Sequence, residues 1–207
     1  MSPRHLRAAR FAQAAGALFL LSTGACYSKR VTRVEPSAVT DLSGRWNDTD
    51  SRLVANELVA QTLAAGWARR YTDQHGGDAP TVIVGTFANR TMEHIQVGTF
   101  VRDIEKALIT TGAARVVASS RERQELRDER KDQQQYSRAD TRAHQGQEHG
   151  ARYALTGELQ AIEDVDGRER VVFYQIDASL VDLETNTKVW VGQHKIKKYV
   201  ERARFGL

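Results

Sequence analysis

The amino-acid sequence predicts a single α/β domain in which a mixed β-sheet is packed by α-helices and the chain ends in a β-hairpin. Apolar residues recur at helical spacing in two segments, 48–67 and 98–112. A β-rich run lies between these segments, and apolar and polar residues alternate over much of the last third. Helices and strands that alternate along a chain are typical of a layered sheet with helices on one face or both.

The first helix is expected over residues 48–67. Thr49 or Asp50 can cap its N-terminus, and acidic residues occupy the first turn. The apolar side chains at helical spacing are Leu53, Val54, Val59, Leu63 and Trp67. They form one stripe, which we expect to face the core.

The next elements follow from chain breaks and β-rich composition. HGGDAP interrupts the chain before TVIVGTF, residues 81–87, which predicts a strand. A second amphipathic helix is expected over 98–112, where Gly112 ends it, and a short strand over 114–119. The residues expected to be buried in this helix are Phe100, Val101, Ile104, Leu108 and Ile109.

Three strands are expected in the last third of the chain. Residues 153–162 predict the first strand, and 171–183 predict the second, in which apolar and polar residues alternate. ETNT then turns the chain into 188–198, so the last two strands form a hairpin. The expected apolar face of the second strand consists of Val172, Tyr174, Ile176, Ala178 and Leu180.

The N-terminal segment has the features of an export signal with a lipid-attachment site. Three arginines and no acid accompany a short apolar run, and Thr23-Gly24-Ala25-Cys26 resembles a bacterial lipobox. Cys26 is the only cysteine and cannot form an internal disulfide, so we interpret it as the lipid-attachment residue. The alternative is an inert cysteine beside an ordinary cleavage site. The predicted organisation is a lipoprotein signal peptide over 1–25, a lipid-anchored tether over 26–40 and the α/β domain over 41–207.

The overall charge does not point to a nucleic-acid partner. The chain has a net charge of +4 and a pI of about 9.3, but residues 1–25 hold three arginines and no acid. Removal of this segment takes the net charge from +4 to +1, which gives no reason to expect nucleic acid.

The sequence shows no pattern of catalytic or metal-ligating residues. None of the six histidines pairs at the HExxH spacing, and a lone cysteine offers no zinc ligand set. Phosphate-binding glycine motifs and the GxSxG nucleophile elbow are missing from the sequence. We therefore expect a protein that is not an enzyme, with no cofactor, no metal and no small-molecule substrate.

The most unusual segment is polar and highly charged, from residue 119 to residue 150. We expect it to be helical in two pieces, with a break near Tyr136. Over RERQELRDERKD, residues 121–132, basic and acidic side chains fall on opposite sides of a helix. The simpler interpretation is that this segment is a solvent-exposed face. The more specific interpretation is that it forms a surface that binds a charged partner. The residues predicted to bind a partner are Arg123, Arg127, Tyr136, Arg138 and Arg142.

Four stretches of the sequence resemble a known family. They are DLSGRWNDTDSRLVANEL, IVGTFANRT, EHGARYALTGEL and LVDLETNTKVWVGQHKIKK, and the resemblance covers about residues 41–199. With the lipobox, they are similar to LpoB-type lipoproteins, which activate penicillin-binding proteins and whose domain is related to TolB N-terminal domains. The shared motifs concern fold and family rather than catalysis.

The resemblance implies an outer-membrane lipoprotein, lipid-anchored and facing the periplasm, that catalyses nothing itself. It implies a partner, the docking domain of a class A penicillin-binding protein, whose glycan polymerisation and peptide cross-linking are stimulated. The tether departs from the family pattern, because it is short and holds a single proline, Pro36. An oligomeric secretion or structural envelope lipoprotein related to curli-type export components stays open as the alternative. The hairpin 169–198 ends in lysines, which favours the activator over a membrane-spanning pore.

Overall fold

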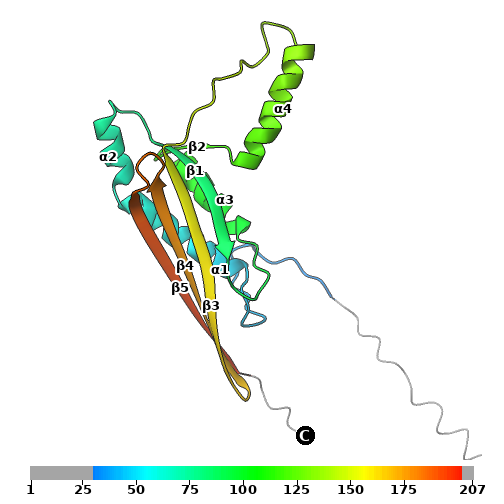
Figure 1. Ribbon diagram of the computed structural model, residues 1–207. Helices are drawn as coiled ribbons and strands as arrows, with labels where there is room; N and C mark the ends of the chain where they lie inside the picture. Colours follow the sequence, from blue (N-terminus) through cyan, green and yellow to red (C-terminus); the bar gives the residue numbers. More distant parts are fainter. Residues whose placement is uncertain (1–29, 202–207) are drawn as a thin grey trace, which may run out of the picture. The chain divides into compact units, whose positions relative to one another are not determined.

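The structure, a computed structural model, describes residues 30–201 of the chain (Figure 1). Cys26 and the predicted signal peptide lie outside the described residues. Residues 30–36 are exposed, and a compact body begins at Ser37. The helices of this body are α1 (Asp48–Ala64), α2 (Trp67–Gln74), α3 (Gly98–Thr110) and α4 (Ser120–Tyr136), and the strands are β1 (Thr81–Asn89), β2 (Arg115–Val117), β3 (Tyr153–Asp166), β4 (Glu169–Asp182) and β5 (Lys188–Glu201).

The sheet is mixed, with the strand order β2-β1-β3-β4-β5. β1 runs parallel to both β2 and β3, whereas β3, β4 and β5 form an antiparallel meander. The turn between β4 and β5 places Asn186 at a φ of 58°, a left-handed conformation that asparagine adopts more readily than most residues. The predicted α/β class and the C-terminal hairpin are therefore confirmed.

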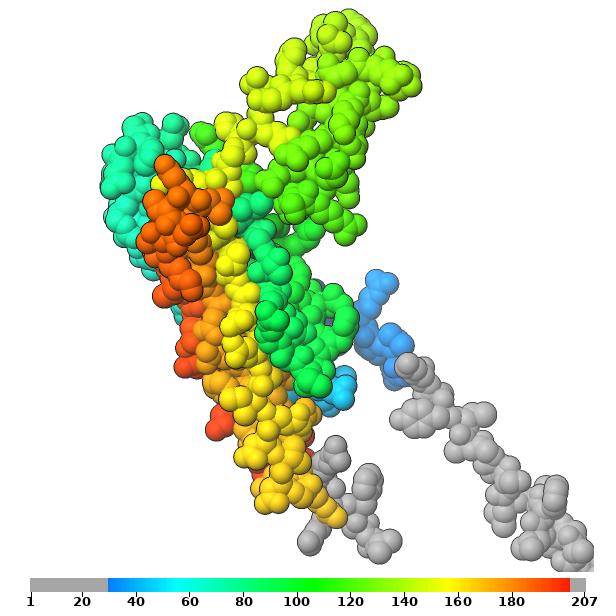
Figure 2. All heavy atoms as spheres, viewed as in Figure 1, coloured from blue at the N-terminus to red at the C-terminus, as the bar shows by residue number. Residues whose placement is uncertain are grey.

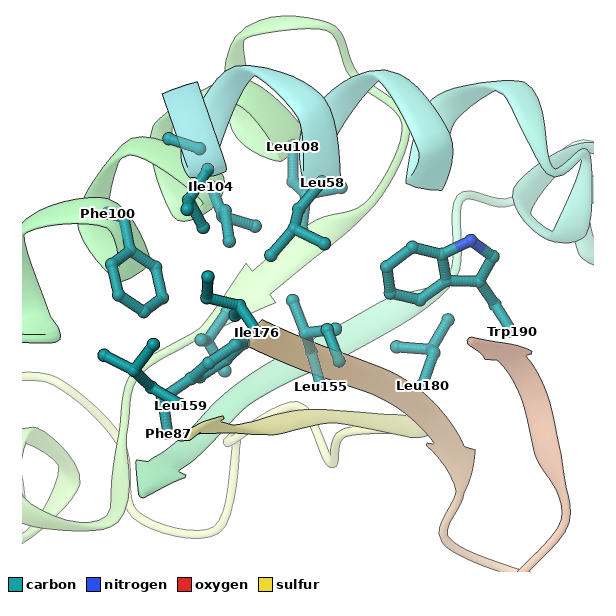
Figure 3. Close-up of a cluster of buried hydrophobic side chains, with 14 of the residues drawn as sticks. Leu58, Phe87, Phe100, Ile104, Leu108, Leu155, Leu159, Ile176, Leu180 and Trp190 are labelled. Atoms are coloured by element: carbon teal, nitrogen blue, oxygen red, sulfur yellow. The ribbon is translucent and has the colours of Figure 1, made fainter. Parts of the chain in front are cut away.

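Helices α1 and α3 pack together on one face of the sheet, as Figures 1 and 3 show. The alternation predicted for β4 is confirmed, because Val172, Tyr174, Ile176, Ala178 and Leu180 are buried on the helix side. The intervening residues of β4 stay partly exposed on the opposite face. The large core side chains between helices and sheet include Leu58, Phe87, Phe100, Ile104, Leu108, Leu155, Leu159, Ile176, Leu180 and Trp190 (Figure 3).

The first helix begins at Asp48, as expected, but its N-cap and its last residue lie earlier than the sequence suggested. Asn47 is the N-cap: its side chain accepts the backbone N–H of Asp50, and the Asp50 carboxylate accepts the N–H of Asn47 in return. This capping box satisfies two backbone donors at once, which neither Thr49 nor Asp50 could do as the N-cap. Gly66 then takes a φ of 68°, so the chain breaks after Ala64, and a separate helix, α2, starts at Trp67.

The buried stripe of α1 is rotated relative to the predicted one. Leu53 and Leu63 are 44% and 38% exposed, so the expectation that they face the core is wrong. Val54 is buried as expected, and the other buried residues of α1 are Thr49, Asp50, Ser51, Ala55, Leu58 and Thr62. Small and weakly polar side chains fill this interface because α1 packs closely on α3 and β5, so apolar periodicity alone misplaced the stripe.

Two expectations about the middle of the chain also need correction. In α3, Phe100, Ile104 and Leu108 are buried as predicted, but Ile109 is 58% exposed. The second helical piece expected after Tyr136 is not a helix, since residues 137–150 contain turns, bends and irregular backbone. Side chains of α4 hydrogen-bond this segment, as described below, in place of a helical ladder.

Candidate functional site

The polar segment singled out in the sequence forms a projecting element, which we call the arm and define as α4 with residues 137–150. None of the 17 residues of α4 is buried, and the arm stands clear of the sheet in Figures 1 and 2. A capping box at Ser119 and Glu122 starts the helix: the Ser119 hydroxyl accepts the Glu122 N–H, and the Glu122 carboxylate accepts the Ser119 N–H at 2.8 Å. Local capping therefore stabilises α4, which gains no stability from burial of its side chains in the core.

The base of the arm contacts α3 through charged side chains. Arg102 of α3 lies 3.8 Å from Glu105 and 3.9 Å from Glu122 of α4. A shallow groove of about 460 Å³ runs beside these residues and is lined by Glu105, Ile109, Val116, Val117, Ala118, Glu122, Glu125 and Leu126. Burial raises the pKa of Glu105 above its ordinary value, and the nearby guanidinium of Arg102 opposes this shift.

Glu148 joins the returning segment of the arm to two arginines of α4, and we call Arg127, Arg130 and Glu148 the arginine clasp. Arg127 donates from Nε to Oε1 at 3.0 Å and from Nη2 to Oε2 at 2.8 Å. Arg130 donates from Nη1 to Oε1 at 2.8 Å. These hydrogen bonds, those from Arg127 foremost, lower the pKa of Glu148 to about 2. The carboxylate of Glu148 is thus ionised under all ordinary conditions.

Two glutamines hold the same segment nearer the end of the helix. Gln134 donates from Nε2 to the carbonyl oxygen of Ala143 at 2.8 Å, and the N–H of Ala143 donates to Oε1 of Gln133 at 3.0 Å. The side-chain amides therefore satisfy both backbone groups of Ala143, as a neighbouring strand would. Segment 137–150 returns along α4 because these amides and the arginine clasp hold it there.

The predicted partner-binding residues all lie on the arm but differ in their surroundings. Arg127 is engaged in the arginine clasp, and Arg138 donates to Asp140 from Nη2 at 2.7 Å. Arg123 is half-buried, and its Nε has no hydrogen-bond partner among the described residues. Tyr136 is 73% exposed at the end of α4. Arg142 is partly exposed in the segment that follows.

The structure adds two residues that the predicted set lacked. Arg130 lies one helical turn beyond Arg127, on the basic side of α4, and could have been included from its spacing. Glu148 had no such signal, because 21 residues separate it from Arg127 and no regular element links them. Only the path of the returning segment brings its carboxylate to the helix.

Residues 30–201 contain no group of three or more His, Cys, Asp or Glu side chains arranged to hold a metal ion. Within the same range, no helix combines the length and apolar character needed to span a bilayer.

Several solved structures are similar to the chain at low sequence identity. The lipoprotein GNA1162 from Neisseria meningitidis is 12% identical, with a TM-score of 0.38, over 62% of this chain and 88% of that one. The LpoB C-terminal domain from Salmonella enterica is 15% identical, with a TM-score of 0.32, over 65% of this chain and 95% of that one. The PelC dodecamer from Paraburkholderia phytofirmans is 18% identical, with a TM-score of 0.34, over 58% of this chain and 73% of that one.

A comparison with curated proteins gives no match. The family model for the peptidoglycan-synthase activator LpoB matches residues 50–196, from the first turn of α1 to β5. This match includes every described helix and strand except the first two residues of α1 and the last five of β5, and it spans well over half of the chain. The chain belongs to the LpoB family of peptidoglycan-synthase activators.

Proposed function

We propose that this protein is an outer-membrane lipoprotein that binds a class A penicillin-binding protein and stimulates its synthesis of peptidoglycan. The family match over residues 50–196 carries the proposal, because the family is one of synthase activators. Cys26, which follows the small residues Gly24 and Ala25, would supply the lipid anchor. The domain would then face the periplasm and act by contact with the synthase, without catalysis of its own.

The arm supports a role in binding the partner. A 17-residue helix that buries none of its side chains has no part in the core and is available for another protein. Arginine and tyrosine are enriched at protein interfaces, and the arm carries both. The proposed contact residues are Arg123, Arg127, Tyr136, Arg138 and Arg142.

A capture experiment tests the proposal. The mature chain with Cys26→Ser is immobilised, a detergent extract of the cell envelope is passed over it, and the bound proteins are identified by mass spectrometry. We expect a class A penicillin-binding protein to be retained, and we expect the purified synthase to polymerise glycan faster when the protein is added. Self-assembly into large oligomers, measured by sedimentation, would instead favour the oligomeric alternative. Capture of other envelope proteins without any synthase would favour it too.

Charge reversal tests whether the arm is the contact surface. In one variant Arg123 and Arg127 become Glu, and in another Arg138 and Arg142 become Glu. Each double reversal should weaken synthase binding by about 1–3 kcal/mol, because like charges then face each other across the interface. The matched control reverses Arg69 and Arg70, which are exposed on α2, outside the arm. Unchanged affinity in both arm variants, with native circular dichroism, would move the contact surface off the arm.

A further inference from the structure

We infer that the arginine clasp is a carboxylate-binding site, occupied by Glu148 in the free protein, which an acidic segment of a partner protein enters by displacing Glu148. The inference deepens the proposed function. It rests on that function in one respect, because it assigns the entering carboxylate to a partner protein. Its test uses a synthetic peptide and does not need the synthase, so the two proposals can fail separately.

The geometry of the clasp is that of carboxylate recognition. Arg127 engages both oxygens of Glu148 with two nearly parallel N–H groups, the fork that matches a carboxylate in shape. Arg130 adds a third hydrogen bond to Oε1, so two guanidinium groups converge on one carboxylate. The two cations exceed the single anion by one charge, which leaves the site attractive to a further acid. The surrounding hollow, about 460 Å³, is also lined by Lys131, Gln145 and Gly146.

Glu148 can be displaced because water still reaches its side chain. The Arg127 and Glu148 side chains are 49% and 27% exposed, and ion pairs in contact with water contribute little net stability. The carboxylate sits in segment 137–150, which contains no helix or strand. Beyond the backbone hydrogen bond of Ser137 at the end of the helix, side-chain hydrogen bonds hold this segment to α4. An incoming carboxylate can make the same three hydrogen bonds, so the exchange costs little and leaves the helix in place.

The surroundings favour a short acidic peptide over a nucleic acid. The other sides of α4 are rich in carboxylates, namely Glu122, Glu125, Asp128, Glu129 and Asp132. These charges repel a long polyanion that extends past the clasp, whereas one or two side-chain carboxylates fit between the arginines. The internal occupant is itself a glutamate, which indicates the ligand class directly.

The internal glutamate should lower the affinity of the site for outside carboxylates. A group tethered by a short flexible segment has an effective concentration on the order of millimolar or above. An external ligand must compete with this local supply, so removal of the Glu148 carboxylate should tighten binding without any change in the arginines.

Fluorescence anisotropy with a labelled, end-capped hexaglutamate peptide tests the inference on the mature chain with Cys26→Ser. We expect Glu148→Gln to bind the peptide at least about tenfold more tightly than the parent chain. Addition of Arg127→Gln to Glu148→Gln should abolish that gain. The matched control is Glu129→Gln, which changes the net charge of the arm equally but removes a carboxylate outside the clasp, one that accepts a hydrogen bond from Gln133. Hydrogen exchange of residues 143–150 in the parent chain should accelerate when the peptide saturates it, because Glu148 is released.

Several outcomes would overturn the inference. A gain of less than about twofold in Glu148→Gln, or an equal gain in Glu129→Gln, would show that the clasp has no special affinity for carboxylates. Equally tight binding of a labelled hexathymidylate would show a general anion patch instead. Unchanged exchange of residues 143–150 at saturating peptide would exclude displacement of Glu148, whatever the behaviour of the variants.

Discussion

Lys198 Nζ, on the last strand, lies 2.6 Å from Oδ2 of Asp50, in the first turn of the first helix. The two side chains are 13% and 3% exposed, so the ion pair is largely shielded from water. The same carboxylate oxygen accepts the backbone N–H of Asn47 at 2.8 Å. One oxygen thus connects the N-cap of α1 to β5, and Lys198 also donates to the carbonyl oxygen of Arg45 at 3.1 Å.

Replacement of Lys198 by methionine should destabilise the domain strongly. Loss of the ammonium leaves the Asp50 carboxylate shielded without its cation, which costs about 3 kcal/mol for a buried pair. The free energy of unfolding, measured in urea, should fall by this amount. Lys197→Met is the matched control, since Lys197 is exposed on the opposite face of β5 and should change stability by less than about 0.5 kcal/mol. Equal losses in the two variants would contradict a role for the ion pair.

The arginine clasp predicts an unusual acid titration of the arm. The Glu148 pKa is lowered from its ordinary 4.5 to about 2, so the stabilisation that it contributes is present above its ordinary range and is lost as pH falls from about 5 towards 2. NMR titration of the Glu148 carboxyl carbon should give a midpoint near 2. In Arg127→Gln/Arg130→Gln the midpoint should return to near 4.5. The control is Arg121→Gln, which removes a cation paired with Glu125 and should leave the midpoint of Glu148 unchanged.

Substitution of Gly157 by alanine should strain the centre of the sheet. An added Cβ would lie 2.5 Å from the carbonyl oxygen of Asp177 and 2.5 Å from the ring of Phe87, and neither can move freely. Overpacking of this kind costs about 1–3 kcal/mol. Thermal unfolding should show the loss, whereas Gly98→Ala, where a Cβ meets nothing within 4 Å, should leave the melting temperature unchanged or higher. A neutral Gly157→Ala would mean that the sheet relaxes around the methyl group.

The arm should depend on its cap more than a core helix would. Ser119→Ala removes the hydroxyl that accepts the Glu122 N–H, at a cost of about 1 kcal/mol. Because α4 buries no residue, this loss should appear locally, as faster amide exchange in α4 with little change in global unfolding. Ser120→Ala, one residue further into the helix, is the control and should not speed exchange. A global loss of stability in Ser119→Ala would show that the arm is coupled to the core.

The lipid anchor predicted at Cys26 has a direct chemical test. Cys26→Ser should release the protein from the membrane fraction, and intact-mass analysis of the parent chain should show a diacylated cysteine as the first residue of the mature protein. An unmodified cysteine in that mass spectrum would contradict the lipobox interpretation. Ser28→Ala, two residues along, serves as the control and should leave the protein in the membrane fraction.

Sequence patterns predicted the buried face of β4 correctly but not that of α1. In β4 successive side chains point to opposite faces, so the alternation from Val172 to Leu180 located the buried face correctly. In α1 several apolar arcs compete, and the inward one includes Ala55 and Thr62, which a search for large apolar residues overlooks. A strand has two faces to choose between, whereas a helix can rotate continuously until its packing partners select the buried side.

The sequence by itself determined the α/β class, the C-terminal hairpin, the family and the polar character of the arm, because local periodicity, turn chemistry and motifs are written in neighbouring residues. Only the tertiary structure decided which side of α1 is buried and which groups meet around α4. Glu148 reaches Arg127 across 21 residues, and Lys198 reaches Asp50 across 148. Charge pairs of this kind depend on the path of the backbone between their members. No spacing in the sequence encodes that path, so the arginine clasp and the ion pair became visible only in the folded chain.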